Sequence, residues 1–295
     1  MTVIAEVAER FADAGVTGWL HAREIDGPGE VAVSADTPVV LASVFKLSLL
    51  LAVFRAAETG EVDLEGRVTL EAGARSGGPT GIGAMFDQVS MSVRDLALLA
   101  MTVSDNAAAD ALVDLVGFSA INRATASLGL STTCVVQRSR EQTASMVRDA
   151  GVADAASLAP LLTDRRVLRT LSALRPEHTN RSTPREMTAL LAALWRDEAA
   201  SPESCAAMRR LLGLQVWPHR LASGFPFDDV RVAGKTGTLP TLRNEVGVVE
   251  YPDGGRYAVA VFTASVRTSL TLPAADAVIG TTARLAVDHL RARTP

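Results

Sequence analysis

The chain has 295 residues and a formal net charge of −4, with 48% hydrophobic and 21% charged residues. This composition is typical of a soluble globular enzyme-sized protein and excludes a disordered chain or a fibrous repeat. Nucleic acid is not expected as a partner, because phosphate binding needs clustered lysines and arginines and the chain has no basic block.

The N-terminal stretch 1–15 predicts a short amphipathic helix. It carries Glu6, Glu9, Arg10 and Asp13 where a signal peptide would need an uninterrupted apolar core. We therefore expect no export signal and a cytoplasmic location for the chain as given.

Both ends of the chain show strand patterns. Near the start, "VTGWLHAREI" and "GEVAVSA" flank the turn "DGPG", and near the end "DDVRVAGKT", "NEVGVVEY" and "RYAVAVFTAS" run apolar or alternate. A last helix is predicted from about Ala274 to Arg293. These patterns predict one antiparallel sheet of about five strands, built from both chain ends and flanked by helices, in an α/β (α+β) fold.

The sequence pattern in the middle of the chain predicts helices. A helix is predicted from Ala107 to Val116, with Gly117 as its stop, and residues 38–54 form an apolar run of about 17 residues. That run contains Lys46 near its middle, so a buried helix is favoured over a membrane span. We expect residues 1–38 and 184–295 to form a sheet lobe and residues 39–183 an all-helical lobe, in one intertwined catalytic unit.

The two lysines are candidate catalytic residues. The chain uses 27 arginines and only two lysines, Lys46 and Lys235. Either lysine is kept where guanidinium does not fit or where an amine must be able to lose its proton, or the two lysines remain by chance in a GC-biased genome. Ser43 lies three residues before Lys46, so both side chains share one helix face. An amine desolvated by the surrounding leucines can have its pKa lowered enough to take a proton from a serine hydroxyl.

Two further motifs have both a structural and a functional interpretation. "SDN" at 104–106 falls between two helical segments, where Ser104 could simply cap a helix or could point into a cleft. "KTG" at 235–237 lies on a predicted strand, where Gly237 could serve a turn at the strand end or let a ligand backbone lie close.

Taken together, Ser-x-x-Lys, Ser-Asp-Asn and Lys-Thr-Gly in this order resemble the class A serine β-lactamases, within the wider group of penicillin-recognising serine hydrolases. The resemblance extends over nearly the whole chain. Further matches are "FADAGVTGWLHARE", "MSVRDLALLAMTVSDNAAADALV", "STPREM", and "RNE" shortly after "KTG".

The resemblance implies roles for the residues of these motifs. Ser43 would attack a lactam or ester carbonyl and form an acyl-enzyme, with Lys46 as proton acceptor or as the group that tunes it. Ser104 would pass a proton to the departing nitrogen, and Lys235 would hold its polarity. Asn106 would contact the acylamide of the substrate and Lys46.

The resemblance also implies an oxyanion hole and a carboxylate site. The backbone N–H groups of Ser43 and Thr238 would form the oxyanion hole, where one donor contributes about 3 kcal/mol in the transition state. Thr236, Gly237, Thr238 and Arg243 would bind the substrate, with Arg243 placed to hold its carboxylate bidentately.

The glutamate that orients the deacylating water in class A enzymes has no clear counterpart. In "LGLSTTCVVQRSREQTASM", Glu141 is the nearest glutamate, but it lies about two residues late and its partner position holds Ser145 instead of asparagine. Glu177 and Asn180 offer a pair with a spacing of three. Glu141 is the candidate base, and the alternative interpretation is that these are surface glutamates.

The sequence therefore predicts a serine β-lactamase that works through an acyl-enzyme on Ser43, of the kind that gives antibiotic resistance. The alternatives are a signal-less esterase or amidase, a D-Ala-D-Ala peptidase-like hydrolase, or a covalent β-lactam binder with poor deacylation. We expect a small-molecule substrate, no cofactor, no metal, no membrane partner and a monomer. Members of the family are usually secreted, whereas no export signal is visible here.

Overall fold

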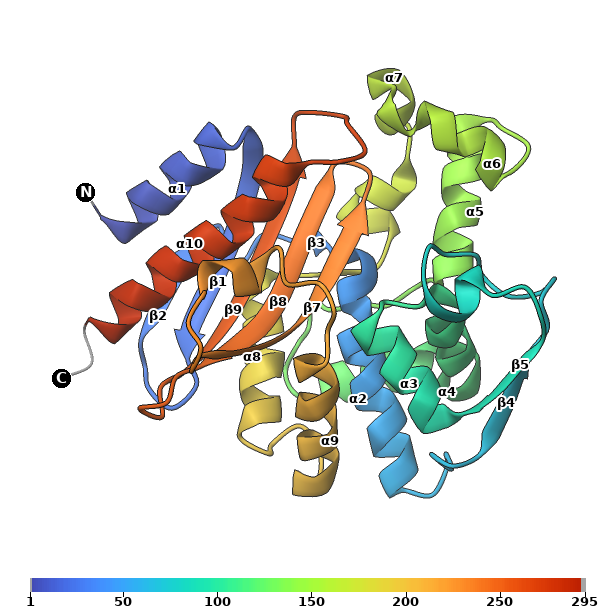
Figure 1. Ribbon diagram of the computed structural model, residues 1–295, viewed down its shortest axis with the longest axis horizontal. Helices are drawn as coiled ribbons and strands as arrows, with labels where there is room; N and C mark the ends of the chain where they lie inside the picture. Colours follow the sequence, from blue (N-terminus) through green and yellow to red (C-terminus); the bar gives the residue numbers. More distant parts are fainter. Residues whose placement is uncertain (1, 293–295) are drawn as a thin grey trace.

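The computed structural model describes residues 2–292 and contains the five-stranded antiparallel sheet that the sequence predicts (Figure 1). Its strand order is β2-β1-β9-β8-β7. The strands are β1 Val16–Glu24, β2 Glu30–Val33, β7 Arg231–Leu239, β8 Leu242–Glu250 and β9 Arg256–Ser265. Strand β1 pairs with β9 along its whole length, so the N-terminal hairpin joins the C-terminal one in a single sheet.

Helices cover both faces of this sheet. The first and last helices lie on one face, and two helices from the middle of the chain cover the other (Figure 1). The helices are α1 Val3–Asp13, α2 Phe45–Glu58, α3 Val93–Thr102, α4 Asn106–Ala126, α5 Ser139–Ala150, α6 Ala155–Leu158, α7 Arg165–Leu168, α8 Pro184–Trp195, α9 Pro202–Gly213 and α10 Pro273–Arg291. Helix α10 begins one residue earlier than predicted, and Arg293 lies outside the described residues.

Strand β9 contributes to two of the three clusters of buried apolar side chains among the described residues. Tyr257, Val259 and Val261 pack with α1 and α10 in one cluster of buried side chains. Ala258, Ala260 and Phe262 face the other way, into a larger cluster that also includes α2, α3, α4, α8 and α9. Because side chains alternate across a strand, one apolar strand can complete both cores. The larger core extends across the predicted lobe boundaries, so the sheet and the helices share it.

The segment 39–183 is mainly helical, with two short two-stranded sheets that were not predicted. One pairs β3 Val39–Val40 with β6 Arg181–Ser182, and the other pairs β4 Arg67–Leu70 with β5 Val89–Ser92. These pairings are only two to four residues long, too short to leave a clear alternating pattern in the sequence. Short 3₁₀ turns complete the segment, at η1 Ala42–Val44, η2 Gly81–Ala84, η3 Ala159–Thr163, η4 Ser172–Leu174 and η5 Pro176–His178, and η6 Leu221–Gly224 follows later in the chain.

Gly117 interrupts the predicted helix without ending the helical region. Its φ of 74° and ψ of 155° are not helical, but helical geometry resumes at once and α4 continues to Ala126. Glycine adopts a positive φ without the steric cost of a Cβ, so it can form this kink.

Helix α2 is buried on nearly all sides. Eleven of its fourteen residues are buried, including Lys46. Among the described residues, no helix is both long and apolar enough to cross a membrane. The predicted helix over 38–54 is confirmed only from Phe45 onward, where α2 forms the central helix of the larger core; the first part of the apolar run forms β3 and η1 instead.

We expect Leu50→Ala to lower the free energy of unfolding by about 2–5 kcal/mol, because Leu50 is 1% exposed in the larger core and its truncation leaves a cavity. Chemical denaturation would measure this change. The matched control is Leu214→Ala, at a side chain that is 43% exposed, which should change stability by less than about 0.5 kcal/mol. Equal losses for the two variants would contradict the assignment of α2 to the core.

Candidate active site

Ser43 lies in a turn whose backbone is anchored on two sides. The turn η1 leads directly into α2, and the residues before it are fixed by two asparagines. The backbone N–H of Leu41 donates to the carbonyl oxygen of Asn180 at 2.9 Å, and Asn244 Nδ2 donates to the carbonyl oxygen of Val40 at 2.9 Å. The hydroxyl of Ser43 is thereby presented from a fixed backbone at the start of a rigid helix.

The residue before Ser43 is strained. Ala42 has a φ of 48°, in the left-handed region, where a residue with a Cβ is less stable by roughly 1–2 kcal/mol. The surrounding packing holds it there, since Ala42 is 2% exposed. Strain of this kind is often found next to functional groups.

Gly237 serves a different purpose from the one expected. It does not lie among the residues that line the pocket, and an added Cβ would lie 2.6 Å from the carbonyl oxygen of Leu41 and 3.0 Å from Cγ2 of Val44. The backbone that needs this space therefore belongs to the turn that carries Ser43, instead of to a ligand. Gly237 lets β7 pack directly against the nucleophile turn.

Lys46 is buried to 1% exposure and directed toward the "SDN" segment. Its Nζ donates to the carbonyl oxygen of Ser104 at 2.6 Å, to Asn106 Oδ1 at 2.9 Å and to the carbonyl oxygen of Asp105 at 3.3 Å. Burial lowers the pKa of Lys46 to about 7, although the carboxylates of Asp105 and Asp110 act in the opposite direction. A lysine with this pKa is partly neutral near pH 7 and can accept a proton.

Ser104 is the meeting point of the two lysines. Its Oγ accepts from Lys46 Nζ at 3.3 Å and from Lys235 Nζ at 2.9 Å. Lys235 is fully buried, and burial together with the nearby Lys46 lowers its pKa well below the usual lysine value. Because two amines donate to the Ser104 oxygen, its own O–H is left to donate to a ligand.

The conformation of the "SDN" segment depends on Asp105. Its Oδ1 accepts from the backbone N–H of Ala108 at 3.1 Å and so caps α4, while its Oδ2 accepts from the backbone N–H of Ile82 in η2. Ser104 itself has a φ of 59°. The predicted choice between a helix cap and a cleft residue is resolved in this way: Asp105 is the cap, and Ser104 lines the pocket.

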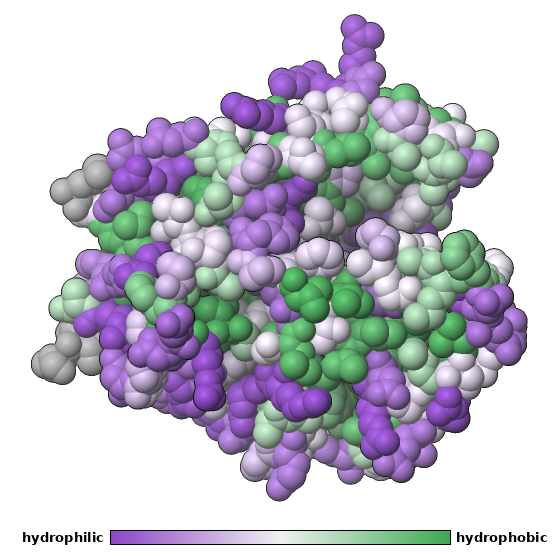
Figure 2. All heavy atoms as spheres, in the orientation of Figure 1, coloured by the Kyte–Doolittle hydropathy of each residue, from purple (hydrophilic) through white to green (hydrophobic). Residues whose placement is uncertain are grey.

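A pocket of about 540 Å³ brings the candidate residues together. The viewed face of the molecule is hollowed between the part that carries α5 to α7, at the upper right, and the part below it (Figure 2). Six of the predicted site residues line the pocket, namely Ser43, Ser104, Asn106, Thr236, Thr238 and Arg243. The other lining residues are Pro79, Thr80, Val103, Trp217, His219, Arg220, Leu270, Thr271, Leu272, Pro273 and Asp276.

The resemblance implied that Arg243 would hold a ligand carboxylate beside Thr238, but the arginine that contacts Thr238 is Arg220. Arg220 Nη2 donates to Thr238 Oγ1 at 2.8 Å, and its Nη1 donates to the carbonyl oxygens of Gly237 and Asn244, each at 3.0 Å. Its Nε pairs with Asp276 Oδ1 at 2.7 Å. It therefore lies directly beside the strand that would bind a ligand carboxylate.

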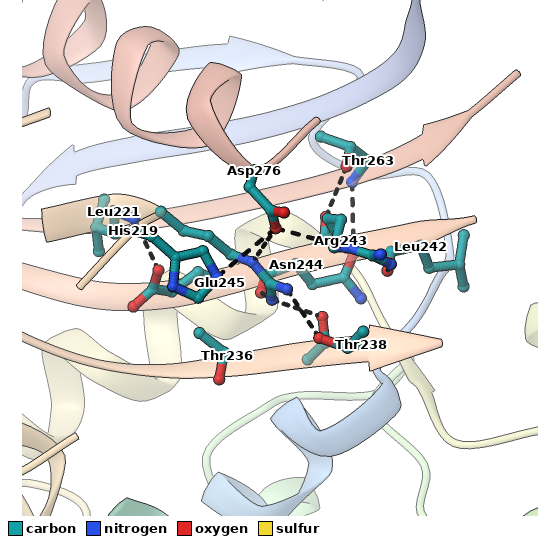
Figure 3. Close-up of polar contacts among 12 residues, drawn as sticks. His219, Leu221, Thr236, Thr238, Leu242, Arg243, Asn244, Glu245, Thr263 and Asp276 are labelled. Carbon is teal, nitrogen blue, oxygen red and sulfur yellow. Dashed lines mark hydrogen bonds and ion pairs between the residues drawn. The ribbon is translucent and has the colours of Figure 1, made fainter. Parts of the chain in front are cut away.

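Arg243 is more fully engaged with the protein than expected. Its guanidinium donates to the carbonyl oxygens of Leu239, Leu242 and Leu270. Its Nε lies 3.5 Å from Asp276 Oδ1, and Figure 3 shows Arg243 beside Asp276 and Leu242. Two guanidinium groups thus share one carboxylate at the edge of the pocket. Arg243 adds positive charge there, but few of its N–H groups are left for a bidentate contact with a ligand.

The candidate deacylating glutamates lie outside the lining of this pocket. The Oε2 of Glu141 accepts from the backbone N–H of Arg138, and its Oε1 pairs with the guanidinium of Arg138, both at 2.8 Å, at the start of α5. Glu177 lines a separate cavity beside Arg181. The position of Glu141 does not support the expected role as a base.

Asn180 and Ser145 also have structural partners. Asn180 Oδ1 accepts from the backbone N–H groups of Val136 and Gln137, and its Nδ2 donates to the Gln137 carbonyl. Ser145 Oγ donates to the carbonyl oxygen of Gln142 within its own helix. These side chains fix the chain around α5 and are not free to hold a water in the pocket.

Three of the pocket residues that were missed at the sequence level come from one segment. Trp217, His219 and Arg220 lie in "WPHR", between α9 and η6. The presence of an aromatic, an imidazole and a guanidinium in four residues was a usable signal. Its distance of fifteen residues from "KTG" hid it, because only the folded chain places the segment beside β7.

We expect Gly237→Ala to lower stability by about 1–3 kcal/mol and to slow any reaction at Ser43 at least tenfold, because the added methyl group would displace the turn that carries Ser43. Thermal unfolding and the rate of reaction with a chromogenic cephalosporin would measure both effects. Gly73→Ala is the matched control, since a Cβ there meets nothing within 4 Å. Unchanged acylation in Gly237→Ala would show that the turn tolerates the added group.

The chain matches known proteins along nearly its whole length. The model of the "Beta-lactamase enzyme family" matches residues 2–290. The "Beta-lactamase regulatory protein BlaB" of Streptomyces cacaoi is 31% identical over 307 residues, which cover 98% of each chain.

Solved structures agree with this match. The crystal structure of a β-lactamase from Sphaerobacter thermophilus is 29% identical, with a TM-score of 0.80 over 99% of this chain and 98% of that chain. A variant of the class A β-lactamase of the last common ancestor of Gram-negative bacteria has a TM-score of 0.80 and 23% identity, over 98% of both chains. The predicted resemblance is confirmed: the chain belongs to the β-lactamase enzyme family and has the fold of its class A members.

Proposed function

We propose that β-lactams acylate Ser43 and that hydrolysis releases the acyl group only slowly, so that the protein works as a covalent β-lactam binder. One observation carries this proposal. Among the described residues that line the pocket, the only carboxylate is Asp276, and it is held by Arg220 and Arg243. Both guanidinium groups engage the same oxygen, Asp276 Oδ1, so this carboxylate is already committed to protein partners and is poorly placed to activate a water.

The groups around the pocket support the acylation half of the proposed reaction. In the proposed step Lys46, which lies three residues after Ser43 and is partly neutral near pH 7, takes the proton of Ser43, whose oxygen attacks the lactam carbonyl. The carbon–nitrogen bond of the lactam breaks, and the Ser104 hydroxyl gives its proton to the departing nitrogen. Lys235 stays in hydrogen-bond contact with Ser104 and can supply a replacement proton.

Arg220, Arg243 and Lys235 favour an anionic ligand. They lie at or beside one side of the pocket, with Thr236 and Thr238 between them on β7. A substrate that bears a carboxylate next to its acyl group, as β-lactams do, would place that carboxylate against Thr238 and Arg220.

The deacylation half lacks its usual base. Hydrolysis of an acyl-enzyme needs a group that takes a proton from water, and general base catalysis typically contributes about 10²–10⁴-fold. Without a free carboxylate in the pocket, the ester would persist. The 31% identical relative is named a regulatory protein, and a long-lived acyl state would suit a protein that reports the presence of a β-lactam.

A second candidate is a β-lactamase with steady turnover. It is favoured by the 29% identical structure, which is that of a β-lactamase. In this case the base would have to be supplied by a group other than Glu141, such as Lys46 itself once it has released its proton.

Reaction with a chromogenic cephalosporin separates these functions. We expect a burst of one equivalent per chain followed by release at least a hundredfold slower, with the intact mass increased by the acyl group. Ser43→Ala should show neither the burst nor the added mass. Steady fast turnover would support the β-lactamase instead, and no acylation by any β-lactam would favour an esterase or peptidase of the same fold.

We expect the acylation rate to rise with pH through a midpoint near 7. Lys46 is protonated below its pKa of about 7 and cannot take the Ser43 proton, whereas above it the neutral amine can. Burst rates measured from pH 5.5 to 8.5 would give this profile. Lys46→Arg keeps a cation that does not lose its proton, so it should acylate at least a hundredfold more slowly at every pH. A flat wild-type profile would count against Lys46 as the base.

A further inference from the structure

A second buried acidic side chain lies behind the pocket without lining it. Glu245 is 1% exposed, and in the sheet it pairs with Thr236 of β7. Its Oε2 accepts from the backbone N–H of Leu221 at 2.7 Å (Figure 3), and its Oε1 accepts from Gln215 Nε2 at 2.7 Å. Burying an ionisable group is costly unless it is paired and hydrogen-bonded, and both oxygens of Glu245 accept such bonds.

The side chain of Glu245 crosses β7 through space left by a glycine. An added Cβ at Gly234 would lie 3.1 Å from Glu245 Oε1. Beyond this glycine, Gln215 Oε1 accepts from the backbone N–H of Thr236 at 2.7 Å. A continuous chain of hydrogen bonds therefore runs from Thr236 through Gln215 to Glu245 and ends at Leu221.

The hydrogen bonds of this series run in a fixed donor-to-acceptor order, and that order requires Glu245 to act only as an acceptor. Both ends are backbone N–H groups, which can only donate, and the amide of Gln215 accepts at one end and donates at the other. Glu245 must therefore accept at both of its oxygens. A glutamine or a protonated carboxyl group at 245 would place a donor against a donor at one of the contacts.

The charges around Glu245 favour its ionised form, while burial opposes it. Lys235 on β7 and Arg220 on the neighbouring segment are the cations that face it, and burial raises its pKa to about 7. Above that pH the carboxylate is ionised and the hydrogen-bond chain is complete.

This series of hydrogen bonds connects two walls of the pocket. Residues 215–221 carry Trp217, His219 and Arg220, which line one wall, and β7 carries Thr236 and Thr238, which line the adjacent one. We propose that Glu245 is a positioning residue that holds the 215–221 wall against β7 through Gln215 and Leu221, and so sets the pocket geometry for an anionic acyl ligand. The choice of ligand rests on the proposed function, whereas the positioning of the wall does not.

Because the hydrogen bonds run in a fixed order, exchanging the side chains of residues 245 and 215 tests the proposal. Glu245→Gln should break the chain at one contact. The double variant Glu245→Gln/Gln215→Glu should restore it, because the introduced carboxylate at 215 accepts from Thr236 and from the new amide at 245, which in turn accepts from Leu221. Glu250→Gln, on the same strand but outside the chain, is the matched control.

Amide hydrogen exchange of the full chain at pH 8.5, measured by NMR, reads the contacts directly. We expect Glu245→Gln to lower the protection of the Leu221 or Thr236 amide about tenfold, as the loss of a buried hydrogen bond implies. The double variant should return both amides to the wild-type level, and Val248 in the middle of β8 should be unaffected in all variants. Unchanged protection in Glu245→Gln, or no recovery in the double variant, would overturn the proposal.

Ligand binding gives an independent readout. In a Ser43→Ala background, which cannot be acylated, Glu245→Gln should raise the Kd for benzylpenicillin about tenfold at pH 8.5, and the exchanged pair should restore it. An unchanged Kd with altered amide protection would overturn the link between the wall and ligand affinity. If the wild-type chain were not acylated by any β-lactam, the proposed function would fail while the exchange experiment still decided the role of Glu245.

Discussion

The contact of two buried amines with one serine hydroxyl is the interaction on which the rest of the site depends. Lys46 and Lys235 come from a helix and a strand far apart in the sequence, and both donate to Ser104 Oγ. Burial lowers the pKa of each lysine, and the nearby charge of Lys46 adds to the effect on Lys235. The same burial that makes this arrangement costly gives the amines their ability to exchange protons.

The surrounding structure keeps this arrangement in place. The larger apolar core buries α2 and therefore Lys46, and the carbonyl oxygens of Ser104 and Asp105 give its protons acceptors. Behind the pocket, Glu245 supplies negative charge opposite Lys235 and anchors the neighbouring wall. Buried charges are tolerated where each has partners, and here the partners also shape the pocket.

The groups of the pocket suit the two halves of the proposed reaction, acylation and deacylation, unequally. Ser43 and Ser104 line one pocket, Lys46 and Lys235 both donate to Ser104 Oγ, and the guanidinium groups of Arg220 and Arg243 bring positive charge to the same pocket. The region where class A enzymes hold a water-activating glutamate is instead used for structure, since Glu141 and Asn180 bond to the backbone around α5. This distribution is the basis of the proposed function, in which the protein captures an acyl group more readily than it releases it.

Much of the fold could be predicted from the sequence. The alternating strands at both ends, the turns between them and the apolar run around Lys46 are local patterns, and they indicated the five-stranded sheet and the central helix. The short pairings β3–β6 and β4–β5 were missed, because two to four residues leave too little periodicity. Gly117 was identified as a helix stop, but the renewed helix after it depends on packing that a local pattern does not report.

For the site, the sequence by itself determined which groups are available: one serine a turn before a lysine in an apolar helix, a second lysine on a strand, and no glutamate at the expected spacing. Only the tertiary structure decided how they are used. In the folded chain, Gly237 makes room for the turn that carries Ser43, and Arg220 lies beside Thr238. Arg243 donates hydrogen bonds to carbonyl oxygens. The physical reason is that hydrogen-bond partners and desolvation depend on which distant segments pack together, and residue spacing along the chain does not contain that information.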